Sequence, residues 1–571
     1  MPNERTTSLE TLAGSATHVV VPKAAEKAQI ARFVAERRTP IALLLLAAAV
    51  RLVVLALHAG SPIDMDGAEY VRMGANLAHG AGLVGMRGFP VVELSPLYPL
   101  AIASLTWFVR DAHAAALALV VIAGVAYTGL LYAITRMLYG EPSARVAALI
   151  GAVLPILVQL STETLSEMPY GVALLAGLWG LLRFVRAHRL ADAAICAAAF
   201  GVAYLTRPEG SLLLLVGFAI VALVAVAATR SVRAPAAFVA IALLFVVPYA
   251  AMTAGITGRV ALESKTAINF MQAKGMLGGA TYLAVADAVD DTGRPIGPEI
   301  APRYYDPHLR PPHVPLGERL GMMARAAGRH VRDLAPEFGA RECGFGLLIV
   351  LSIVGLTRSV WSQARTRDEL ILFAFVVTSY VALSTVLHFW PRYAVAFIPF
   401  AVIWAARGVV ELHDWSRRSR LPDVGFALLG ILVVGSLAVD VAEARPDGAP
   451  IERAAGTWIA HHGVPHARIV DVSNRVAFYG GATWAALPYG SEQGSLRYLT
   501  AVAPDYVVLD SSRAQDYPRL ARWFAGAPPA RQLRLVYRID EGTGRTLRVY
   551  RWLSPPPPGG PSLPPPITRS S

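Results

Sequence analysis

The feature that most constrains the fold is a series of apolar runs, each long enough to cross a lipid bilayer. A transmembrane helix needs about 20 mainly apolar residues, and such runs recur between residues 39 and 441. Hydrophobic residues make up 55% of the 571 residues and charged residues only 16%. A soluble globule of this length does not have that composition. The chain is therefore predicted to be a polytopic membrane protein.

By length and hydropathy we count about eleven candidate spans. They cover residues 39–59, 113–138, 144–160, 166–183, 190–206, 209–228, 234–254, 343–358, 369–388, 391–411 and 424–441. The apolar segment 95–108 is not counted, because a full span there would invert every later connection against the arginine pattern described next. It is predicted to be a juxtamembrane helix that lies in the outer leaflet.

Arginine residues are concentrated in alternate connections between these spans. The rich connections hold Arg136, Arg145, Arg183, Arg186, Arg189, Arg230, Arg233, Arg358, Arg365, Arg367, Arg417, Arg418 and Arg420. The opposite short connections hold only Arg110, Arg207 and Arg392. The positive-inside rule places the rich set in the cytoplasm, so the N-terminus is predicted to be cytoplasmic and the region after residue 441 extracytoplasmic, in an inner (plasma) membrane.

The arginine-rich connections also explain the net charge of +12, because basic loops of a membrane protein face anionic lipid. Membrane lipids are therefore expected partners, and nucleic acid is not. The two cysteines, Cys196 and Cys343, lie far apart in apolar runs, which supports neither a disulfide framework nor a thiolate metal site.

The expected fold class is an all-α membrane bundle followed by a small α/β domain. The predicted regions are a cytoplasmic segment 1–38, a transmembrane domain 39–441 with outer loops 60–112 and 255–342, an extracytoplasmic domain 445–553 and a disordered Pro-rich tail 554–571. Four β-branched and aromatic stretches predict strands in the outer domain: "ARIVDV", "DYVVLD", "LRLVYRI" and "TLRVYRW".

An acidic stretch, "SPIDMDGAEYVRMGANLAHGAGL", follows the first span directly. Its apolar residues recur at helical spacing after Asp66, and Gly80 and Gly82 end the pattern. Asp66 is therefore expected to cap or begin a short amphipathic helix, and capping alone would explain it. A catalytic role is the competing interpretation, shared with Asp64 and Glu69. The D-x-D pattern carries little information, so no cofactor is predicted, and a divalent metal is possible but unsupported.

Four further ionisable residues lie at the outer ends of later spans. Glu167 and Glu209 stand at helix starts, where the helix dipole alone favours an acid. Arg207 and Arg392 oppose that dipole, which a bound anion would explain, although snorkelling is the alternative for Arg392. A carboxylate can take a proton from a hydroxyl, and arginines bind phosphate through forked hydrogen bonds. The set therefore suits displacement of a phosphate leaving group by an alcohol.

In this arrangement the chain resembles the C-type (GT-C) integral-membrane glycosyltransferases, which include the protein O-mannosyltransferases, the aminoarabinose transferases and the RgtA/B/C/D-like family. The resemblance covers about residues 40 to 410. Its motifs, in order, are D-x-x-x-Y at Asp66 and Tyr70, A-x-x-L-x-x-G-x-G, with a one-residue shift, at Ala75, Leu77, Gly80 and Gly82, P-L-Y-P at Pro96 to Pro99, S-E at Ser166 and Glu167, "YLTRPEG" at Tyr204 to Gly210, and R-Y at Arg392 and Tyr393 with Pro399 beyond.

The resemblance implies transfer of a sugar from a polyprenyl-phosphate donor to a glycan, glycolipid or protein acceptor on the outer face, with inversion and with Asp66 as general base. Many relatives have a second acid directly after that aspartate, where this chain has Gly67. The candidates are Asp66, Asp64, Glu69 and Glu167 for catalysis, Arg207 and Arg392 for the donor phosphate, and Tyr70, Tyr98, Glu209 and Tyr393 for substrate binding. Tyr70 is also expected to pack against the P-L-Y-P segment.

A secondary transporter or flippase of a lipid or sugar is the main alternative, since charged residues in spans also mark substrate paths. A transporter would be expected to have charged residues deep within its spans and symmetry between the two halves of its sequence. Here the charged residues stand at the outer ends of the predicted spans. A non-catalytic membrane scaffold is a third interpretation, and arginines at helix starts argue against it.

Overall fold

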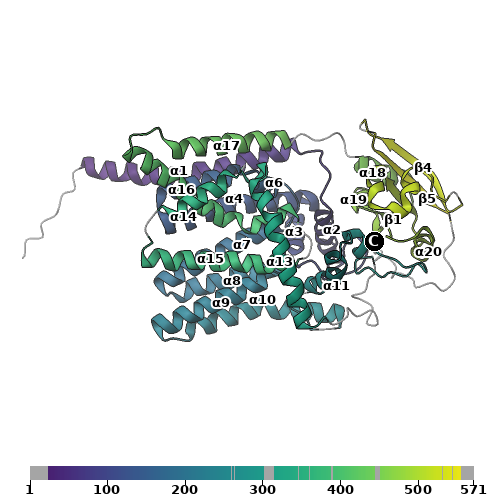
Figure 1. Cartoon of the computed structure of the whole chain (residues 1–571), viewed down its shortest axis with the longest axis horizontal. Coiled ribbons are helices and arrows are strands. Elements are labelled where there is room, and N and C mark those ends of the chain that lie inside the picture. The colour runs from purple at the N-terminus through teal and green to yellow at the C-terminus, as the bar shows by residue number, and fades with distance from the viewer. Residues whose placement is uncertain are drawn as a thin grey trace, which may run out of the picture.

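The computed structural model describes residues 23–553, apart from positions 259, 263, 301–313, 345, 359–360, 387–389, 444–450, 530 and 543. The first 22 residues of the expected cytoplasmic segment and the expected Pro-rich tail lie outside the described residues. Figure 1 shows a bundle of long helices at one side and a small domain with a sheet at the other.

The bundle and its outer loops are helical along most of their length. In chain order the helices are α1 (Lys23–Leu57), α2 (Met65–Ala78), α3 (Leu97–Val109), α4 (Ala112–Tyr139), α5 (Glu141–Val153), α6 (Pro155–Gln159), α7 (Glu167–Ala187), α8 (Leu190–Thr206), α9 (Gly210–Val224), η1 (Ala225–Thr229), α10 (Arg233–Thr257), α11 (Lys265–Leu277), α12 (Tyr282–Ala286), α13 (Leu316–Gly339), η2 (Arg341–Cys343), α14 (Leu347–Thr357), α15 (Gln363–Ser384), η3 (Pro391–Ala396), α16 (Ile398–Arg418) and α17 (Val424–Glu443).

The predicted count of eleven spans is not confirmed. Among the described residues, six helices are long and apolar enough to cross a membrane, and a bent pair, Leu316–Gly339 with Arg341–Thr357, raises the number to seven. The other predicted spans fall on shorter or more charged helices. For example, α5 has 13 residues and α8 has 17, and α15 begins with a charged turn that contains Arg365, Asp368 and Glu369.

Glycines allow some bundle helices to touch through their main chains. A Cβ atom on Gly408 of α16 would lie 1.9 Å from Leu351 O, and one on Gly355 of α14 would lie 2.1 Å from Trp404 O. Small residues at helix crossings are typical of membrane bundles, because they permit close packing where no hydrophobic force joins the helices. Larger side chains at either position would push α14 and α16 apart.

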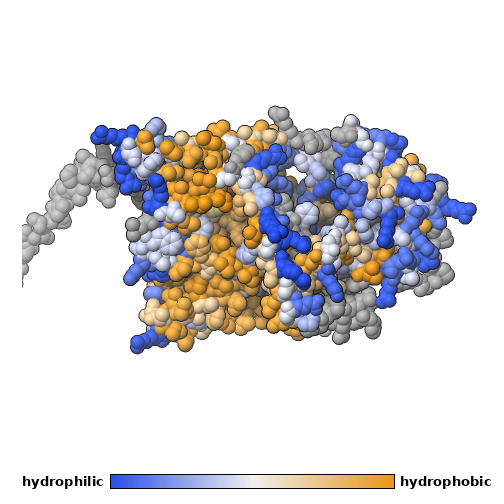
Figure 2. Space-filling view, viewed as in Figure 1, coloured by the Kyte–Doolittle hydropathy of each residue, from blue (hydrophilic) through white to orange (hydrophobic). Residues whose placement is uncertain are grey.

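The arginine-rich connections meet at one end of the bundle. Arg186, in the last turn of α7, lies 2.5 Å from Asp368 of α15 (Nη2 to Oδ2), and the Tyr139 hydroxyl, at the end of α4, donates to Glu369 Oε1 at 2.6 Å. Figure 2 shows an apolar belt over the helices with polar ends on both sides. In Figure 1 the sheet lies beyond the other end of the helices, so the arginine-rich connections and the sheet lie on opposite sides of the apolar belt.

The sheet has five strands in the order β2-β1-β3-β5-β4. They are β1 (Arg468–Asp471), β2 (Thr483–Ala486), β3 (Tyr506–Asp510), β4 (Leu533–Asp540) and β5 (Thr546–Trp552), with α18 (Ile451–His462), α19 (Arg475–Tyr479), α20 (Glu492–Val502) and α21 (Ala521–Phe524). β1 pairs in parallel with β2 and β3, whereas β5 is antiparallel to β3 and β4. Four strands fall on the predicted stretches. Sequence reasoning missed β2, in which Ala485 and Ala486 have a low preference for strands.

The sheet domain is fixed to the start of α2. Asn474 Nδ2 donates to Met65 O at 2.7 Å, and Arg475 Nε donates to Ile63 O at 2.8 Å. The Tyr479 hydroxyl accepts a hydrogen bond from Ile63 N at 2.9 Å. The first outer loop therefore lies between the helical bundle and the sheet domain.

Candidate active site

Helix α2 presents Asp66 in its first turn. The N-cap is Asp64, whose Oδ1 accepts hydrogen bonds from Asp66 N at 2.8 Å and Gly67 N at 3.5 Å. The expectation that Asp66 caps or begins this helix is thus refined, because the cap is the aspartate two residues earlier. An N-cap carboxylate is held by the main chain, so Asp64 performs the capping and the Asp66 carboxylate is left for other contacts.

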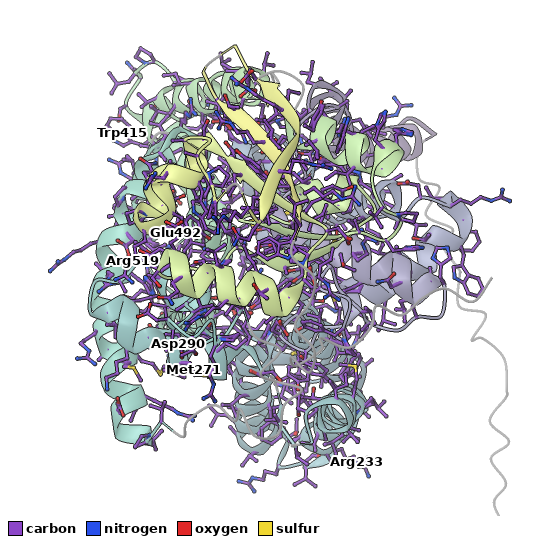
Figure 3. All side chains as sticks on the ribbon, turned by 90° about the vertical axis from the view of Figure 1, so that its right-hand side faces the viewer. Arg233, Met271, Asp290, Trp415, Glu492 and Arg519 are labelled. Atoms are coloured by element: carbon purple, nitrogen blue, oxygen red, sulfur yellow. The ribbon has the colours of Figure 1, made fainter. Side chains whose placement is uncertain are left out.

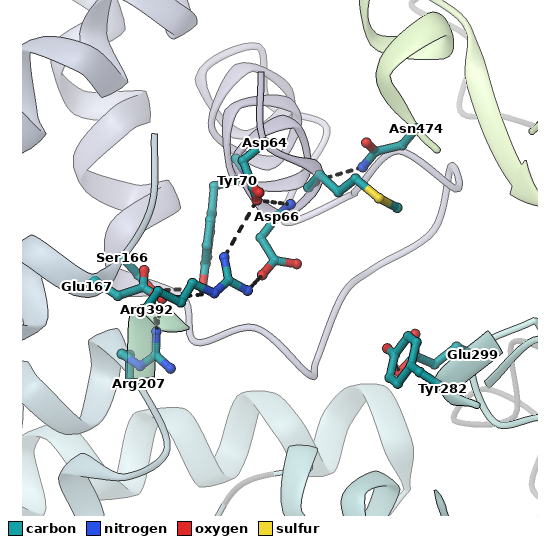
Figure 4. Close-up of polar contacts among 12 residues, drawn as sticks. Asp64, Asp66, Tyr70, Ser166, Glu167, Arg207, Tyr282, Glu299, Arg392 and Asn474 are labelled. Atoms are coloured by element: carbon teal, nitrogen blue, oxygen red, sulfur yellow. Dashed lines mark hydrogen bonds and ion pairs between the residues drawn. The ribbon is translucent and has the colours of Figure 1, made fainter. Parts of the chain in front are cut away.

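The guanidinium of Arg392 lies among three carboxylates (Figure 4). Its Nη2 is hydrogen-bonded to Asp66 Oδ2, its Nη1 lies 3.7 Å from Asp64 Oδ1, and its Nε lies 3.6 Å from Glu167 Oε1. Arg392 stands in the 3₁₀ turn η3, ahead of α16. The prediction that it opens a span is therefore wrong in detail, since the Pro391–Ala396 turn comes before the helix.

Arg207 extends the same network. Its Nη1 lies 2.8 Å from Glu167 Oε1, and its Nη2 lies 3.3 Å from Glu209 Oε1. Glu167 is 3% exposed and is shared by Arg207 and Arg392, while its Oε2 has no hydrogen-bond partner among the described residues. Both glutamates thus neutralise a buried cation, so the helix dipole is not their only role.

Tyr70 packs as expected against the P-L-Y-P segment. Its ring meets that of Tyr98 edge to face, with centroids 5.1 Å apart, and its hydroxyl donates to Ser166 Oγ at 3.1 Å. Tyr98 is buried behind it, with its hydroxyl 3.5 Å from Ala116 O. Tyr98 therefore supports Tyr70 and does not line the cavity described below.

Glu69 lies apart from the arginine network. Both of its carboxylate oxygens accept from Met86 N, at 3.1 and 3.2 Å, and burial raises its pKa to about 7. A Cβ atom on Gly85 would lie 1.8 Å from Glu69 Oε1, so a side chain at that position would displace the Glu69 carboxylate. The structure therefore brings Asp64 and Glu167, but not Glu69, into contact with the guanidinium that holds Asp66.

The Asp66 side chain, 44% exposed, faces a cavity of about 1070 Å³. Arg392, Tyr393 and Lys265 line the same cavity. Burial raises the pKa of Asp66, but the positive charges of Arg392 and Lys265 outweigh it and hold that pKa below its usual value. Lys265 was missed by sequence reasoning, because it begins α11 within an outer loop and not at the end of a span.

The carboxylates around Asp66 surround a guanidinium and not a metal site. Within the described ranges, no group of three or more His, Cys, Asp or Glu side chains could hold a metal ion. The position between Asp66, Asp64 and Glu167 is filled by the guanidinium of Arg392. The carboxylates thus have an organic cation as their partner.

Part of the chain is similar in sequence to one protein family, and the chain is similar in fold to several solved structures. Residues 93–252 match the dolichyl-phosphate-mannose-protein mannosyltransferase family model. This region contains Glu167, Arg207 and Glu209, whereas Asp66 and Arg392 lie outside it. No curated protein matches the chain by sequence.

Solved structures match over most of the chain. The oligosaccharyltransferase AglB from Archaeoglobus fulgidus, in complex with an inhibitory peptide and a dolichol-phosphate, is 14% identical with a TM-score of 0.53, over 89% of this chain and 74% of that one. ArnT from Cupriavidus metallidurans, bound to undecaprenyl phosphate, is 13% identical with a TM-score of 0.53, over 88% and 97%. The resemblance inferred from the motifs is confirmed: residues 93–252 are similar to the mannosyltransferase family model, and the chain shares the fold of AglB and ArnT, which are GT-C membrane glycosyltransferases.

Proposed function

We propose that this protein transfers a sugar from a polyprenyl-phosphate donor to a hydroxyl group of an acceptor on the outer face of the membrane. The observation that carries the proposal is the contact between Asp66 and Arg392 at a cavity on the sheet side of the bundle. It joins a proton acceptor to a phosphate-binding group. Proteins of similar fold bind dolichol-phosphate and undecaprenyl phosphate, which supports a donor of that class.

In the proposed reaction, Asp66 takes the proton of the acceptor hydroxyl. The acceptor oxygen forms a bond to the anomeric carbon, the bond from that carbon to the phosphate oxygen breaks, and its electron pair leaves with the polyprenyl phosphate. Attack from the face opposite the leaving group inverts the anomeric carbon. The positive charges of Arg392, Arg207 and Lys265 stabilise the phosphate as its charge grows.

The ion pair links donor binding to activation of the base. A carboxylate whose pKa is held low by Arg392 is a weak base, because general bases work best with a pKa near the working pH. A donor phosphate that binds Arg392 competes with Asp66 for the guanidinium. The pKa of Asp66 then rises, so the base gains strength only when donor is present.

We expect transfer to be independent of divalent metal. The charge that a metal would supply is provided by Arg392, which fills the space between three carboxylates. Initial transfer rates should be unchanged after treatment with EDTA and dialysis. A rate that falls and is restored by Mg²⁺ or Mn²⁺ would show that a metal ion takes part.

The proposed site requires the sheet domain and the first outer loop to face outward. Cysteines introduced at Ala187 and Arg418 should resist an impermeant maleimide in intact spheroplasts, whereas one at Glu492 should react. The two native cysteines are free and buried, so they give little background. Labelling at Ala187 or Arg418 from outside would reverse the orientation.

The proposed function is tested by mass analysis of cell-envelope glycans and glycolipids. Cells that lack the gene should lose one sugar residue from a glycan or glycolipid, and the wild-type gene should restore it. The transporter alternative predicts instead that a lipid-linked sugar accumulates on the inner leaflet. A deletion strain in which all glycans, glycolipids and glycoproteins are unchanged would contradict the transferase.

A further inference from the structure

The parallel part of the sheet has a topological switch point. β1 lies between β2 and β3, so the two connections that follow it run to opposite sides. In open α/β sheets, ligands bind in the crevice at the carboxyl ends of strands where the strand order reverses. Asp471 ends β1 and Asp510 ends β3, so two carboxylates stand at that place.

This edge of the sheet forms the second wall of the cavity that holds Asp66. The residues that line the cavity from the sheet domain include Glu452, Asp471, Asn474, Asp510, Ser512 and Arg545. We call these six residues the sheet-edge cluster. Figure 3 views the molecule from this side, with the sheet domain in front of the helical bundle.

Two buried side chains of the sheet-edge cluster have free hydrogen-bond acceptors. Glu452 is 6% exposed and Asn474 is 3% exposed. Glu452 Oε2 and Asn474 Oδ1 have no hydrogen-bond partner among the described residues. A buried acceptor without a partner costs about 1–3 kcal/mol, so a bound group that donates hydrogen bonds to these two atoms would be stabilised.

The chemistry of the cluster argues against a metal ion. Arg545 Nη2 lies 2.6 Å from Glu452 Oε1 and 2.6 Å from Asp510 Oδ2, so a guanidinium already neutralises these carboxylates. The remaining free atoms accept hydrogen bonds, and Ser512 Oγ, whose proton is donated to Asp510 Oδ1, can accept them too. Neighbouring acceptors of this kind match the hydroxyl groups of a sugar, each of which donates one hydrogen bond.

Aromatic side chains provide the apolar surfaces of the same cavity. Phe89, Tyr282 and Trp484 line it together with the sheet-edge cluster. Binding sites for small molecules combine such surfaces with a few placed polar groups. The rings suit the apolar faces of a sugar ring, and the polar groups suit its edge.

We propose that the sheet-edge cluster is the acceptor subsite and that the acceptor is a carbohydrate. The inference rests on the proposed function, because it assigns the acceptor of that reaction. The acceptor's sugar rings would be held at the carboxyl ends of β1 and β3, with one hydroxyl directed towards Asp66 across the cavity. A peptide acceptor is the competing occupant.

The test uses the full-length protein in lipid nanodiscs and an array that carries oligosaccharides and Ser/Thr peptides. The wild-type protein should bind a subset of the oligosaccharides. Glu452→Gln should weaken that binding about tenfold, as expected for loss of one hydrogen bond to a charged group. The matched control is Glu492→Gln, which makes the same change at an exposed position at the start of α20 (Figure 3) and should bind as the wild type does.

A second variant guards against misfolding. Ser512 is exposed to the cavity, and its Oγ donates to Asp510 Oδ1 at 2.8 Å. Ser512→Ala should fold normally and weaken oligosaccharide binding about threefold to tenfold. Binding of undecaprenyl phosphate to the same nanodiscs should be unchanged in both variants, which separates this inference from the donor site.

Three results would overturn the assignment. These are binding to peptides alone, no binding to any oligosaccharide, and oligosaccharide binding that neither Glu452→Gln nor Ser512→Ala weakens. Failure of the wild-type protein to bind undecaprenyl phosphate would instead count against the proposed function. The two failures are therefore distinguishable in one preparation.

Discussion

Asp66→Asn should lower the rate of sugar transfer by about 10²- to 10⁴-fold, the usual contribution of general base catalysis. Asparagine keeps the size of the side chain and can still accept a hydrogen bond from Arg392, but it cannot accept a proton. Donor binding should persist, so the loss should appear in kcat more than in KM. Initial rates in proteoliposomes with a polyprenyl-phosphate donor would measure it.

Asp64→Asn is the matched control for this change. Asp64 caps α2 through Oδ1, and asparagine caps a helix as well as aspartate does. Its effect should therefore be small, unless Asp64 replaces the acid missing at Gly67. An Asp66→Asn protein that transfers sugar at the normal rate would remove Asp66 from the mechanism and leave Glu167 or Glu69 as the next candidate.

Arg392→Ala should have the second large effect, on donor binding. The change removes the cation shared by three carboxylates, and a hydrogen bond to a charged group contributes about 1.5–3 kcal/mol. Loss of that contribution from phosphate binding would raise the Kd for undecaprenyl phosphate about tenfold or more. Arg392→Lys should restore binding only in part, because lysine lacks the planar fork that contacts several oxygens.

Arg534→Ala serves as the control, because Arg534 is an exposed arginine on β4. It should bind undecaprenyl phosphate as the wild type does. Fluorescence titration of proteins in nanodiscs would compare the three variants. Unchanged donor affinity and turnover in Arg392→Ala would show that Arg392 has no anion role and only snorkels to the interface.

The sequence predicted that the candidate residues lie on one side of the bundle, but not the contacts among them. Asp66 and Arg392 are 326 positions apart, and only the alternation of arginine-rich connections indicated that both lie on one side. Their direct pairing depends on how η3 turns before α16. Lys265 gave no signal, because a lone lysine in a long outer loop has no periodicity or cost that marks it.

The number of membrane-spanning helices shows what hydropathy analysis of a sequence cannot predict. A run of apolar residues predicts burial in lipid or protein, and it does not tell a full span from a short helix packed inside the bundle. α14 has 11 residues, and the segment Arg341–Thr357 that contains it meets α13 at a bend of 73°. The apolar run was therefore found correctly, whereas its passage across the membrane depends on neighbours that the sequence does not reveal.

The contacts between the sheet domain and the start of α2 affect how proteins of this fold can change in evolution. Asn474 and Arg475 both hold the start of α2 through main-chain oxygens, those of Met65 and Ile63. A main-chain acceptor is present whatever the side chain is. Substitutions around Asp66 can therefore accumulate in a lineage without loosening the domain, whereas exchange of the domain for another requires donors at the same two places.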